Sequence, residues 1–377
     1  MNLTQDVLHY IDSHQQEAFD LLITLAQIPA PSGQEQLRVA FCLEWLHKQG
    51  AKAAYADEAL NVILPVGCDG EKPIMVFMAH SDVVFPDTTP LPLRMENGKL
   101  YCPGVGDDTA NVVAILMAAK YITERHLVPT NCGILLVVNS CEEGLGNLKG
   151  CRKIMEDFGA RVAEFVTFDS SVFTVINEAV GSRRYQIEVR TEGGHSYDRF
   201  GNRNAIACMA ELIQDLYAVE VPAIGKTTYN VGTISGGTSV NTIAQYAQML
   251  YEFRSNKREA LQIMEDTFRK IIAKHREIGL DIAITSVGDR PCSGDVDPEK
   301  EQDLSRRTAE AVLRNFGHAV KYGSGSTDCN IPLSMGIPAV CIGCADGGGA
   351  HTREEFVYID SLKSGLGLAF DMILHHF

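Results

Sequence analysis

The chain has 377 residues, a length that suits about two domains better than one ordinary core. Hydrophobic residues make up 45% and charged residues 21%, the balance of a globular protein, which excludes a disordered or fibrous chain. The formal net charge is -15, and no basic run offsets it, so the surface would repel nucleic-acid phosphates and anionic lipid. We therefore expect neither a nucleic-acid partner nor a membrane partner.

The N-terminal segment and the cysteines indicate the cellular compartment. The N-terminal segment lacks a basic stretch followed by an apolar core, so we expect no secretory signal. The 11 cysteines are scattered without framework spacing, which indicates reduced thiols of a cytoplasmic protein. Cys341 and Cys344 have the spacing of a redox or zinc pair, but no second pair accompanies them. We interpret both as small core residues.

The first predicted elements are two helices. Apolar residues near helical spacing predict the first helix, and they are Val7, Leu8, Ile11, Leu21, Leu22 and Leu25. Ser32 and Glu35 have the pattern of a capping box, which predicts the start of a second helix, and Gly50 would end it.

Beyond residue 50, short apolar runs alternate with helical segments. Four runs suit buried strands, at residues 74–79, 133–139, 165–168 and 339–342. Residues 110–122 are apolar on most sides, which predicts a buried helix. This alternation predicts an α/β fold with a mostly parallel sheet and helices on both faces.

The middle of the chain departs from this alternation. Residues 183–290 predict strand, helix, strand, strand, helix and strand, the βαββαβ order of a ferredoxin-like sandwich. We interpret this segment as a second domain inserted into the first, because folded domains tolerate insertion at surface loops. The predicted first domain then consists of residues 1–182 and 291–377.

Ligand-type residues follow the four apolar strands. They are His80, Asp82, Glu142, Glu143, Asp169 and His351. Asp107 lies just before the predicted buried helix, where a helix N-terminus favours a carboxylate. Because sites in open α/β sheets form outside the carboxyl ends of the strands, we expect these side chains to converge.

This set of side chains suits divalent metal ions. Two histidines and several carboxylates favour zinc, manganese or cobalt, and a shared carboxylate can hold two metals about 3.5–4 Å apart. The HEXXH pattern of single-zinc proteases is absent. Each group alone has a simpler interpretation: a polar loop histidine, a solvated turn at Glu142 and Glu143, or a helix cap at Asp107 and Asp108. The metal hypothesis therefore rests on their joint occurrence after strands of one fold.

Short segments spread along nearly the whole chain match one known family. They are MAHSDVV, GVGDDTAN, SCEEGLG, TFDSS, GGHSYDRFGNRNAI, SVNTIAQ, YEFRS, GSTDCNIPLSMGIPAV and GGGAHTREEFVYI. In their order and spacing, the sequence resembles the di-zinc exopeptidases that include peptidase T, carboxypeptidase G, aminoacylase and succinyl-diaminopimelate desuccinylase. The resemblance implies two Zn²⁺ ions per chain, with Co²⁺ or Mn²⁺ as possible substitutes.

The resemblance also implies a role for each metal-ligand candidate. It implies that His80 and Asp169 bind one zinc ion, that Glu143 and His351 bind the other, and that Asp107 bridges the two.

Further roles near the metals follow from the same resemblance. It implies that Glu142 is the general base and that Asp82 orients His80 behind the metal, as metal-bound imidazoles require. The peptide bond between Asp107 and Asp108 is expected to be cis, a costly conformation outside proline.

In the inserted domain, the resemblance implies a lid and a dimerisation surface. His195 matches a histidine that reaches the active site of the partner subunit, so a homodimer is expected. Asn241 and Arg254 match residues that bind substrate oxygens, and the planar fork of arginine suits a carboxylate.

The sequence departs from the family pattern at several places. Thr109 and its neighbours stand where the family usually has Lys-Gly or Met-Lys, Ala244 replaces a proline, and Ser170 and Ser171 follow Asp169. No predicted metal ligand is lost, so these departures concern the substrate.

The expected function is the hydrolysis of an amide bond in a dipeptide or tripeptide, as in peptidase T. Water activated by the metals would attack the carbonyl, and Glu142 would take up and return the proton. One alternative is a deacylase of N-acyl amino acids, since the chemistry is the same. A weaker alternative is a non-catalytic binding protein on the same fold, which would have no need to keep Glu142.

Overall fold

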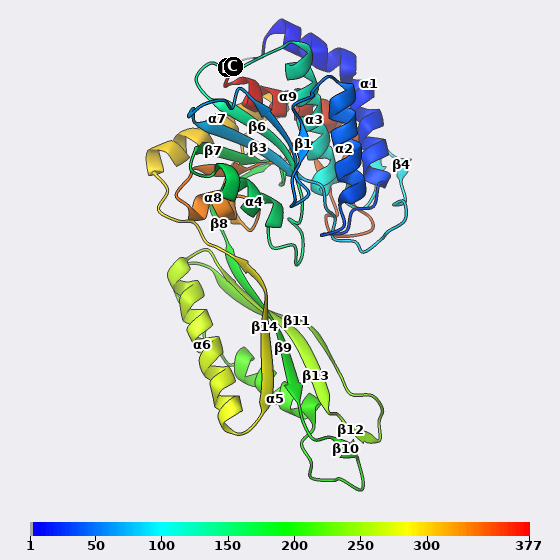
Figure 1. The fold of residues 1–377 in the computed structure, drawn as a ribbon, viewed down its shortest axis with the longest axis vertical. Coiled ribbons are helices and arrows are strands. Elements are labelled where there is room, and N and C mark those ends of the chain that lie inside the picture. The colour runs from blue at the N-terminus through cyan, green and yellow to red at the C-terminus, as the bar shows by residue number, and fades with distance from the viewer. Residues whose placement is uncertain (1–2) are drawn as a thin grey trace. The chain divides into compact units, whose positions relative to one another are not determined.

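The computed structural model describes residues 3–377. The chain divides into two compact units, and in Figure 1, which is coloured by residue number, the smaller one runs from green to yellow. The larger unit contains the residues up to Ala179 and those from Gly294 onward, and the smaller unit is Val180–Ser293. The inserted domain predicted from the sequence covers residues 183–290.

The larger unit is built on an eight-stranded sheet with the order β1-β2-β6-β3-β7-β16-β8-β15. In that order the strands are Tyr55–Ala56, Val62–Val66, Gly133–Asn139, Ile74–His80, Val162–Thr167, Ala339–Cys341, Thr174–Ala179 and Lys321–Gly325. The neighbours β6 and β7 both run parallel to β3, and β16 runs parallel to β7. The pairs β1–β2, β2–β6 and β16–β8 are antiparallel. The predicted mostly parallel α/β sheet is therefore confirmed.

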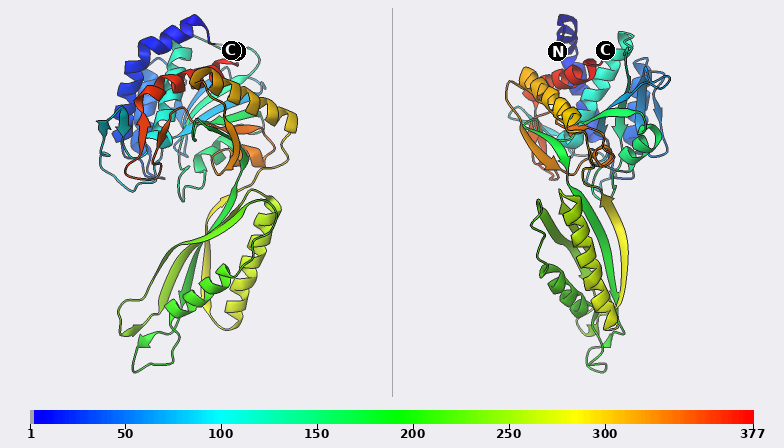
Figure 2. Two further views of the ribbon diagram at one scale, coloured as in Figure 1. Left: turned by 180° about the vertical axis from the view of Figure 1, so that it is seen from behind. Right: turned by 90° about the vertical axis from the view of Figure 1, so that its left-hand side faces the viewer.

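Successive side chains of a strand point to opposite sides of the sheet, and in this sheet the side chains on both sides are apolar. In β3, Phe77 and Ala79 belong to one buried core, and Val76 and Met78 belong to the other. Helices α1, α3 and α9 contribute to the first core, and α4 and α8 contribute to the second. Figure 2 shows these helices on both sides of the sheet, as the alternation of elements predicted.

The helices of the larger unit are α1 (Gln5–Gln27), α2 (Gln36–Lys48), α3 (Ala110–Glu124), α4 (Lys149–Phe158), α7 (Pro298–Phe316), α8 (Asn330–Ser334) and α9 (Leu362–Leu374). The predicted buried helix corresponds to α3, in which every residue from Ala110 to Ile122 is buried. A single turn of π-helix, η1 (Val105–Thr109), leads into it.

A small antiparallel sheet in the larger unit was not predicted. Its order is β17-β18-β5-β4, and its strands are Gly347–Gly348, Phe356–Tyr358, Lys99–Tyr101 and Arg94–Glu96. Strands of two or three residues are too short for a period of two to stand out in a sequence. The sheet matters for the site because His351 lies in the loop between β17 and β18.

The smaller unit has the predicted βαββαβ order. Its sheet has the order β11-β13-β9-β14, with all three pairs antiparallel. The strands are β9 (Gly181–Arg190), β11 (Thr227–Gly236), β13 (Tyr246–Ser255) and β14 (Asp281–Arg290), and the helices are α5 (Ala205–Tyr217) and α6 (Arg258–Glu277). Alternate residues of β13 are buried and pack with both helices in one core. The ferredoxin-like sandwich is therefore confirmed.

Two further observations concern the whole described chain. None of the helices within residues 3–377 combines the length and the apolar character needed to cross a bilayer. Cys341 and Cys344 are buried, free thiols, which confirms their interpretation as core residues.

Candidate metal centre

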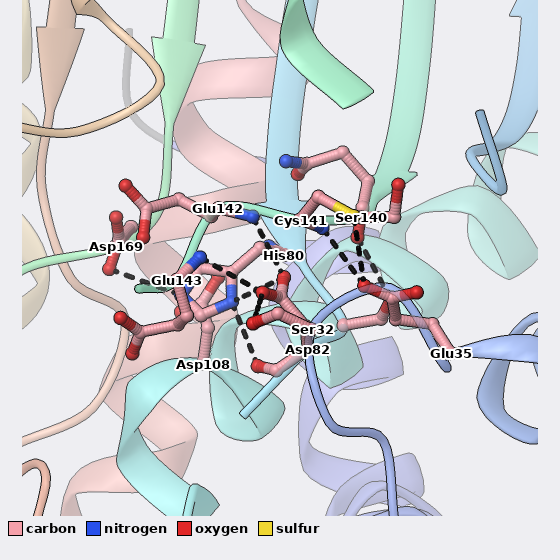
Figure 3. Close-up of polar contacts among 12 residues, drawn as sticks. Ser32, Glu35, His80, Asp82, Asp108, Ser140, Cys141, Glu142, Glu143 and Asp169 are labelled. Carbon is pink, nitrogen blue, oxygen red and sulfur yellow. Dashed lines mark hydrogen bonds and ion pairs between the residues drawn. The ribbon is translucent and has the colours of Figure 1, made fainter. Parts of the chain in front are cut away.

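Three neighbouring parallel strands carry predicted ligands to one edge of the large sheet. His80 is the last residue of β3, Glu143 follows β6, and Asp169 follows β7. In the registers of these strands, His80 lies opposite Asn139 of β6, and Met78 lies opposite Thr167 of β7. The three carboxyl ends therefore meet, and Figure 3 shows His80 with the side chain of Asp169 beside it.

The five predicted metal ligands form one cluster of contacts. His80 Nε2 lies 3.0 Å from Asp107 Oδ1 and 3.5 Å from Asp169 Oδ1. His351 Nε2 lies 3.2 Å from Asp107 Oδ2 and 2.9 Å from Glu143 Oε1. Asp107 thus presents one carboxylate oxygen to each histidine, as a carboxylate shared by two cations would.

The donor set fits divalent metal ions. The donor atoms of His80, Asp107 and Glu143 all lie within 4.8 Å of one another, and so do those of His80, Asp108 and Asp169. Imidazole nitrogens and carboxylate oxygens are the ligands that zinc, cobalt and manganese take in proteins. The residues present therefore fit the pair of cations that the sequence predicted.

The ionised groups of the cluster perturb one another. Burial raises the pKa of Asp107, but hydrogen bonds with His351 and His80 outweigh burial and hold that pKa well below its usual value. Hydrogen bonds with Asp107 and Glu143 raise the pKa of His351 to about 10. Burial raises the pKa of Asp169 to about 6, although His80 acts in the opposite direction. Strongly perturbed groups gathered at one end of a sheet are typical of a functional site.

Asp108 is buried beside the cluster, although no metal-ligand role was predicted for it. Its Oδ2 accepts a hydrogen bond from the backbone N–H of His80 at 2.7 Å, and its Oδ1 accepts one from the side chain of Asn111. Asn111 also accepts a hydrogen bond from the backbone N–H of Cys344, which leads into the His351 loop. Asp108 and Asn111 therefore connect three of the segments that carry predicted ligands.

The segment that carries Asp107 is held by a buried glutamate. Glu355 accepts hydrogen bonds at 2.8 Å from the backbone N–H groups of Gly104, Gly106 and Asp107. Burial raises the pKa of Glu355 to about 7. The peptide bond between Asp107 and Asp108 is cis, as the resemblance predicted.

Asp82 has several partners besides His80, the one predicted from the sequence. His80 Nδ1 donates to the backbone carbonyl of Asp82 at 3.0 Å, and the Asp82 carboxylate lies 3.5 Å from the same nitrogen. The carboxylate accepts hydrogen bonds from the backbone N–H groups of Glu142 and Glu143, at 3.0 and 2.9 Å, and from the Ser32 hydroxyl at 2.6 Å. Asp82 therefore connects the ends of β3 and β6 as well as contacting His80.

The predicted capping box is wrong. Helix α2 begins at Gln36, and Glu35 makes no side-chain cap. Instead, Glu35 Oε1 accepts hydrogen bonds from the backbone N–H groups of Gly33, at 2.7 Å, and Cys141, at 3.1 Å. The Ser32 hydroxyl donates its hydrogen bond to the Asp82 carboxylate. Both side chains support the segments around β3 and β6, a tertiary use that a local capping pattern does not reveal.

Glu142, the predicted general base, begins the same turn as Glu143. The residue is 5% exposed, and its backbone N–H is held by Asp82. Figure 3 shows Glu142 and Glu143 leaving adjacent backbone positions close to His80. The structure therefore brings Glu142 to the same edge of the sheet as the ligand candidates.

The three predicted substrate residues of the smaller unit fall into two groups. His195 belongs to β10 (Gly194–His195), which pairs with β12 (Thr242–Ile243), and the N–H of Ser196 donates to the carbonyl of Asn241 at 3.0 Å. Arg254 lies near the far end of β13, where its guanidinium contacts Glu252 at 2.9 and 3.0 Å. At about 3.3 Å per residue, β13 from Tyr246 to Arg254 spans roughly 26 Å. His195 and Asn241 are thus neighbours, and Arg254 is remote from both.

A cavity of about 220 Å³ adjoins the cluster in the larger unit. Asp107 and Asp169 form part of its wall. Most of the remaining lining residues are small, acidic or aromatic, and they include Ser170, Ser171, Asp346, Gly347, Gly348 and Phe356. The cavity offers space for one small group of a substrate beside the predicted metals.

Comparison with known proteins agrees with this geometry. Residues 76–375 match the model of Peptidase family M20/M25/M40. A succinyl-diaminopimelate desuccinylase from Halorhodospira halophila is 25% identical over 363 residues, which cover 90% of this chain and 91% of that protein.

Solved structures share the fold at low identity. A tripeptidase from Staphylococcus aureus has a TM-score of 0.73 at 21% identity, covering 95% of this chain and 97% of that one. The YXEP protein from Bacillus subtilis, a dinuclear metal binding peptidase, has a TM-score of 0.64 at 16% identity, covering 97% and 100%. The family match includes every predicted metal ligand, from His80 to His351. The chain therefore belongs to Peptidase family M20/M25/M40 and is a metal-dependent hydrolase, as its motifs predicted.

Proposed function

We propose that the protein hydrolyses an amide bond of a short peptide, a dipeptide or tripeptide with a free amino terminus, by means of two divalent metal ions. The observation that carries the proposal is the Asp107 carboxylate, whose two oxygens lie 3.0 and 3.2 Å from different histidines. His80 and Asp169 would hold one ion, Glu143 and His351 the other, and Asp107 both. Zinc is the proposed metal, with cobalt or manganese as substitutes.

The residues around the ions have distinct tasks in this reaction. When bound, the ions supply Lewis-acid activation of water and of the scissile carbonyl. The Glu142 carboxylate takes a proton from the attacking water and delivers it to the leaving amine. Asp82 fixes the backbone from which Glu142 and Glu143 extend, so the base and a metal ligand keep a constant spacing.

The cavity beside the centre favours a peptide over an N-succinyl substrate. Asp346 is half-buried in the cavity wall, and its carboxylate accepts no hydrogen bond from any residue between 3 and 377. A carboxylate without a partner suits the ammonium group of a peptide amino terminus and repels a succinyl carboxylate. Deacylation of N-acyl amino acids remains the second candidate, supported by the similarity to the desuccinylase.

The two groups of residues in the smaller unit support a homodimer. An extended tripeptide spans about 10 Å, so it cannot reach both Arg254 and the pair His195 and Asn241 of one chain across roughly 26 Å. Near that pair, the apolar side chains of Tyr197, Phe200 and Val240 are 86%, 92% and 102% exposed. Exposed apolar side chains of this kind often mark an interface. We therefore assign His195 and Asn241 to the site of a partner subunit in a two-fold dimer.

The first test is a substrate panel with metal removal. Dipeptides and tripeptides with free amino termini should be hydrolysed faster than their N-acetylated forms and faster than N-succinyl or N-acetyl amino acids. Chelation should abolish the activity because it removes the ions that activate the water. Zinc, cobalt or manganese should restore it because the same ligands can bind these ions again. Activity that is indifferent to chelators would refute the metal mechanism, and faster hydrolysis of the acyl amino acids would favour the deacylase.

The second prediction concerns the base. Glu142→Gln should lower kcat by roughly 10²–10⁴-fold with little change in KM, because the amide preserves the shape but cannot accept the proton. Metal content should stay at the wild-type value, measured by elemental analysis of the dialysed protein. The comparison variant is His351→Ala, which should lose metal. Substantial activity in Glu142→Gln would show that another group takes the proton.

The third prediction concerns the support of Asp107. Glu355→Gln replaces one acceptor oxygen by a donor that cannot bind backbone N–H groups, so Asp107 should be less well placed. Zinc affinity should fall by roughly 10–100-fold, as for other groups behind metal ligands. Competition with a chromophoric chelator measures this, and Glu354→Gln is the matched control, since Glu354 is exposed and pairs with Arg94. Equal zinc affinity in the two variants would contradict the assigned role of Glu355.

The fourth prediction tests the exchange of His195 between subunits. His195→Ala and Glu142→Gln chains should each be nearly inactive alone. After co-expression, about half of the dimers should be mixed, and each mixed dimer has one site with both residues intact. About a quarter of the wild-type activity should therefore return. If mixed dimers are isolated and remain inactive, His195 does not act across the interface.

A further inference from the structure

Arg38 is a buried cation that the proposed mechanism does not use. It lies in α2 and is 0% exposed. No carboxylate within residues 3–377 comes within ion-pair distance of its guanidinium. Asp82 and Glu355 act on this charge only from beyond that distance, so hydrogen bonds must offset much of the cost of burying it.

The compensation comes from the C-terminal end of α1. Arg38 Nε donates to the carbonyl of Ile28 at 2.8 Å, and Nη2 donates to the carbonyl of Ala26 at 3.4 Å. A helix C-terminus carries partial negative charge, and the last turn of α1 contains no basic residue of its own. Burial lowers the pKa of Arg38 to about 10, so the group remains a cation at neutral pH.

The other donors of Arg38 reach two segments of the metal centre. Nη1 donates at 3.0 Å to the carbonyl of Ser81 and also at 3.0 Å to the hydroxyl of Thr109. Ser81 lies between His80 and Asp82 in the sequence. Thr109 ends η1, two residues after Asp107. One nitrogen therefore joins the segment of a histidine ligand to the segment of the shared carboxylate.

The Thr109 hydroxyl continues this connection. It accepts the hydrogen bond of Arg38 and donates to the carbonyl of Gly104, which precedes η1. The Thr109 hydroxyl thus links the last residue of η1, the turn that carries Asp107, to the residue before η1, and it is itself hydrogen-bonded by Arg38.

We infer that Arg38 is a positioning residue of the metal centre, which sets His80 and Asp107 at their mutual spacing before a metal binds. The inference rests on the proposed metal-binding function. Arginine suits the task because its planar fork spans acceptors on α1, on the segment after β3 and on η1, whereas the lysine ammonium is a single point. Arg38 touches no ligand side chain, so it acts only through the backbone and Thr109.

The test measures zinc affinity in the metal-free protein with a competing chromophoric chelator. Arg38→Met keeps the length of the side chain and removes its donors, and it should weaken zinc binding by roughly 10–100-fold. Arg38→Lys should lie between Arg38→Met and the wild type, because it keeps the charge but not the fork. Thr109→Val should also weaken binding, and combining it with Arg38→Met should cost less than the product of the separate losses, since both break one connection.

The matched control is Lys120→Met in α3. Lys120 is another buried cation of the larger unit, and both oxygens of Glu17 on α1 contact it at 2.6 Å. It makes no contact with the ligand segments, so Lys120→Met should lower the thermal midpoint of unfolding while zinc affinity stays at the wild-type value. A general loss of stability is thereby separated from a loss of metal geometry.

The outcomes are distinct. If Arg38→Met and Thr109→Val bind zinc as tightly as Lys120→Met does, Arg38 is merely structural and the inference is overturned. If Arg38→Met does not fold, Thr109→Val and Arg38→Lys decide the question, since both retain most of the buried contacts. If the wild-type protein binds no metal, the proposed function itself fails, and the inference falls with it.

Discussion

The structure depends on one carboxylate that is shared by two histidines. Asp107 faces His80 with one oxygen and His351 with the other, and these histidines come from opposite halves of the chain. Any displacement of Asp107 would change both contacts together. Much of the buried polar structure around the centre is therefore devoted to holding the turn that carries it, through Glu355 from one side and Arg38 with Thr109 from another.

The contacts that hold this turn use buried carboxylates, which would destabilise the folded protein if they had no hydrogen-bond partners. The Asp82 carboxylate takes two backbone N–H groups and a hydroxyl, and the Glu355 carboxylate takes three backbone N–H groups. Such charge-assisted hydrogen bonds are stronger than neutral ones, and burial excludes the water that would compete for them. The ligand side chains are left to contact one another, so the protein concentrates negative charge where a cation would be bound.

The sequence was sufficient to predict what depends on local pattern. The parallel sheet, the βαββαβ insertion and the convergence of His80, Glu143 and Asp169 follow from apolar runs and from the rule that sites form at strand ends. The supports were missed because their partners are distant in sequence. Glu35 contacts Cys141 across 106 positions, and its capping-box pattern suggested a nearer partner. Nothing in the sequence of α2 distinguishes the fully buried Arg38 from an exposed arginine, which is the usual case.

The two units of the chain carry different parts of the predicted site, the metal-ligand candidates in one and the predicted substrate-binding residues in the other. The larger unit contains all the metal-ligand candidates, and its strands and buried hydrogen bonds position the segments that carry them. The smaller unit holds Arg254 at one end of its sheet and His195 with Asn241 toward the other. Because rigid strands separate these ends by roughly 26 Å, no bending of the unit can bring all three to one small substrate. If His195, Asn241 and Arg254 all bind one small substrate, as proposed, they must come from two copies of the chain.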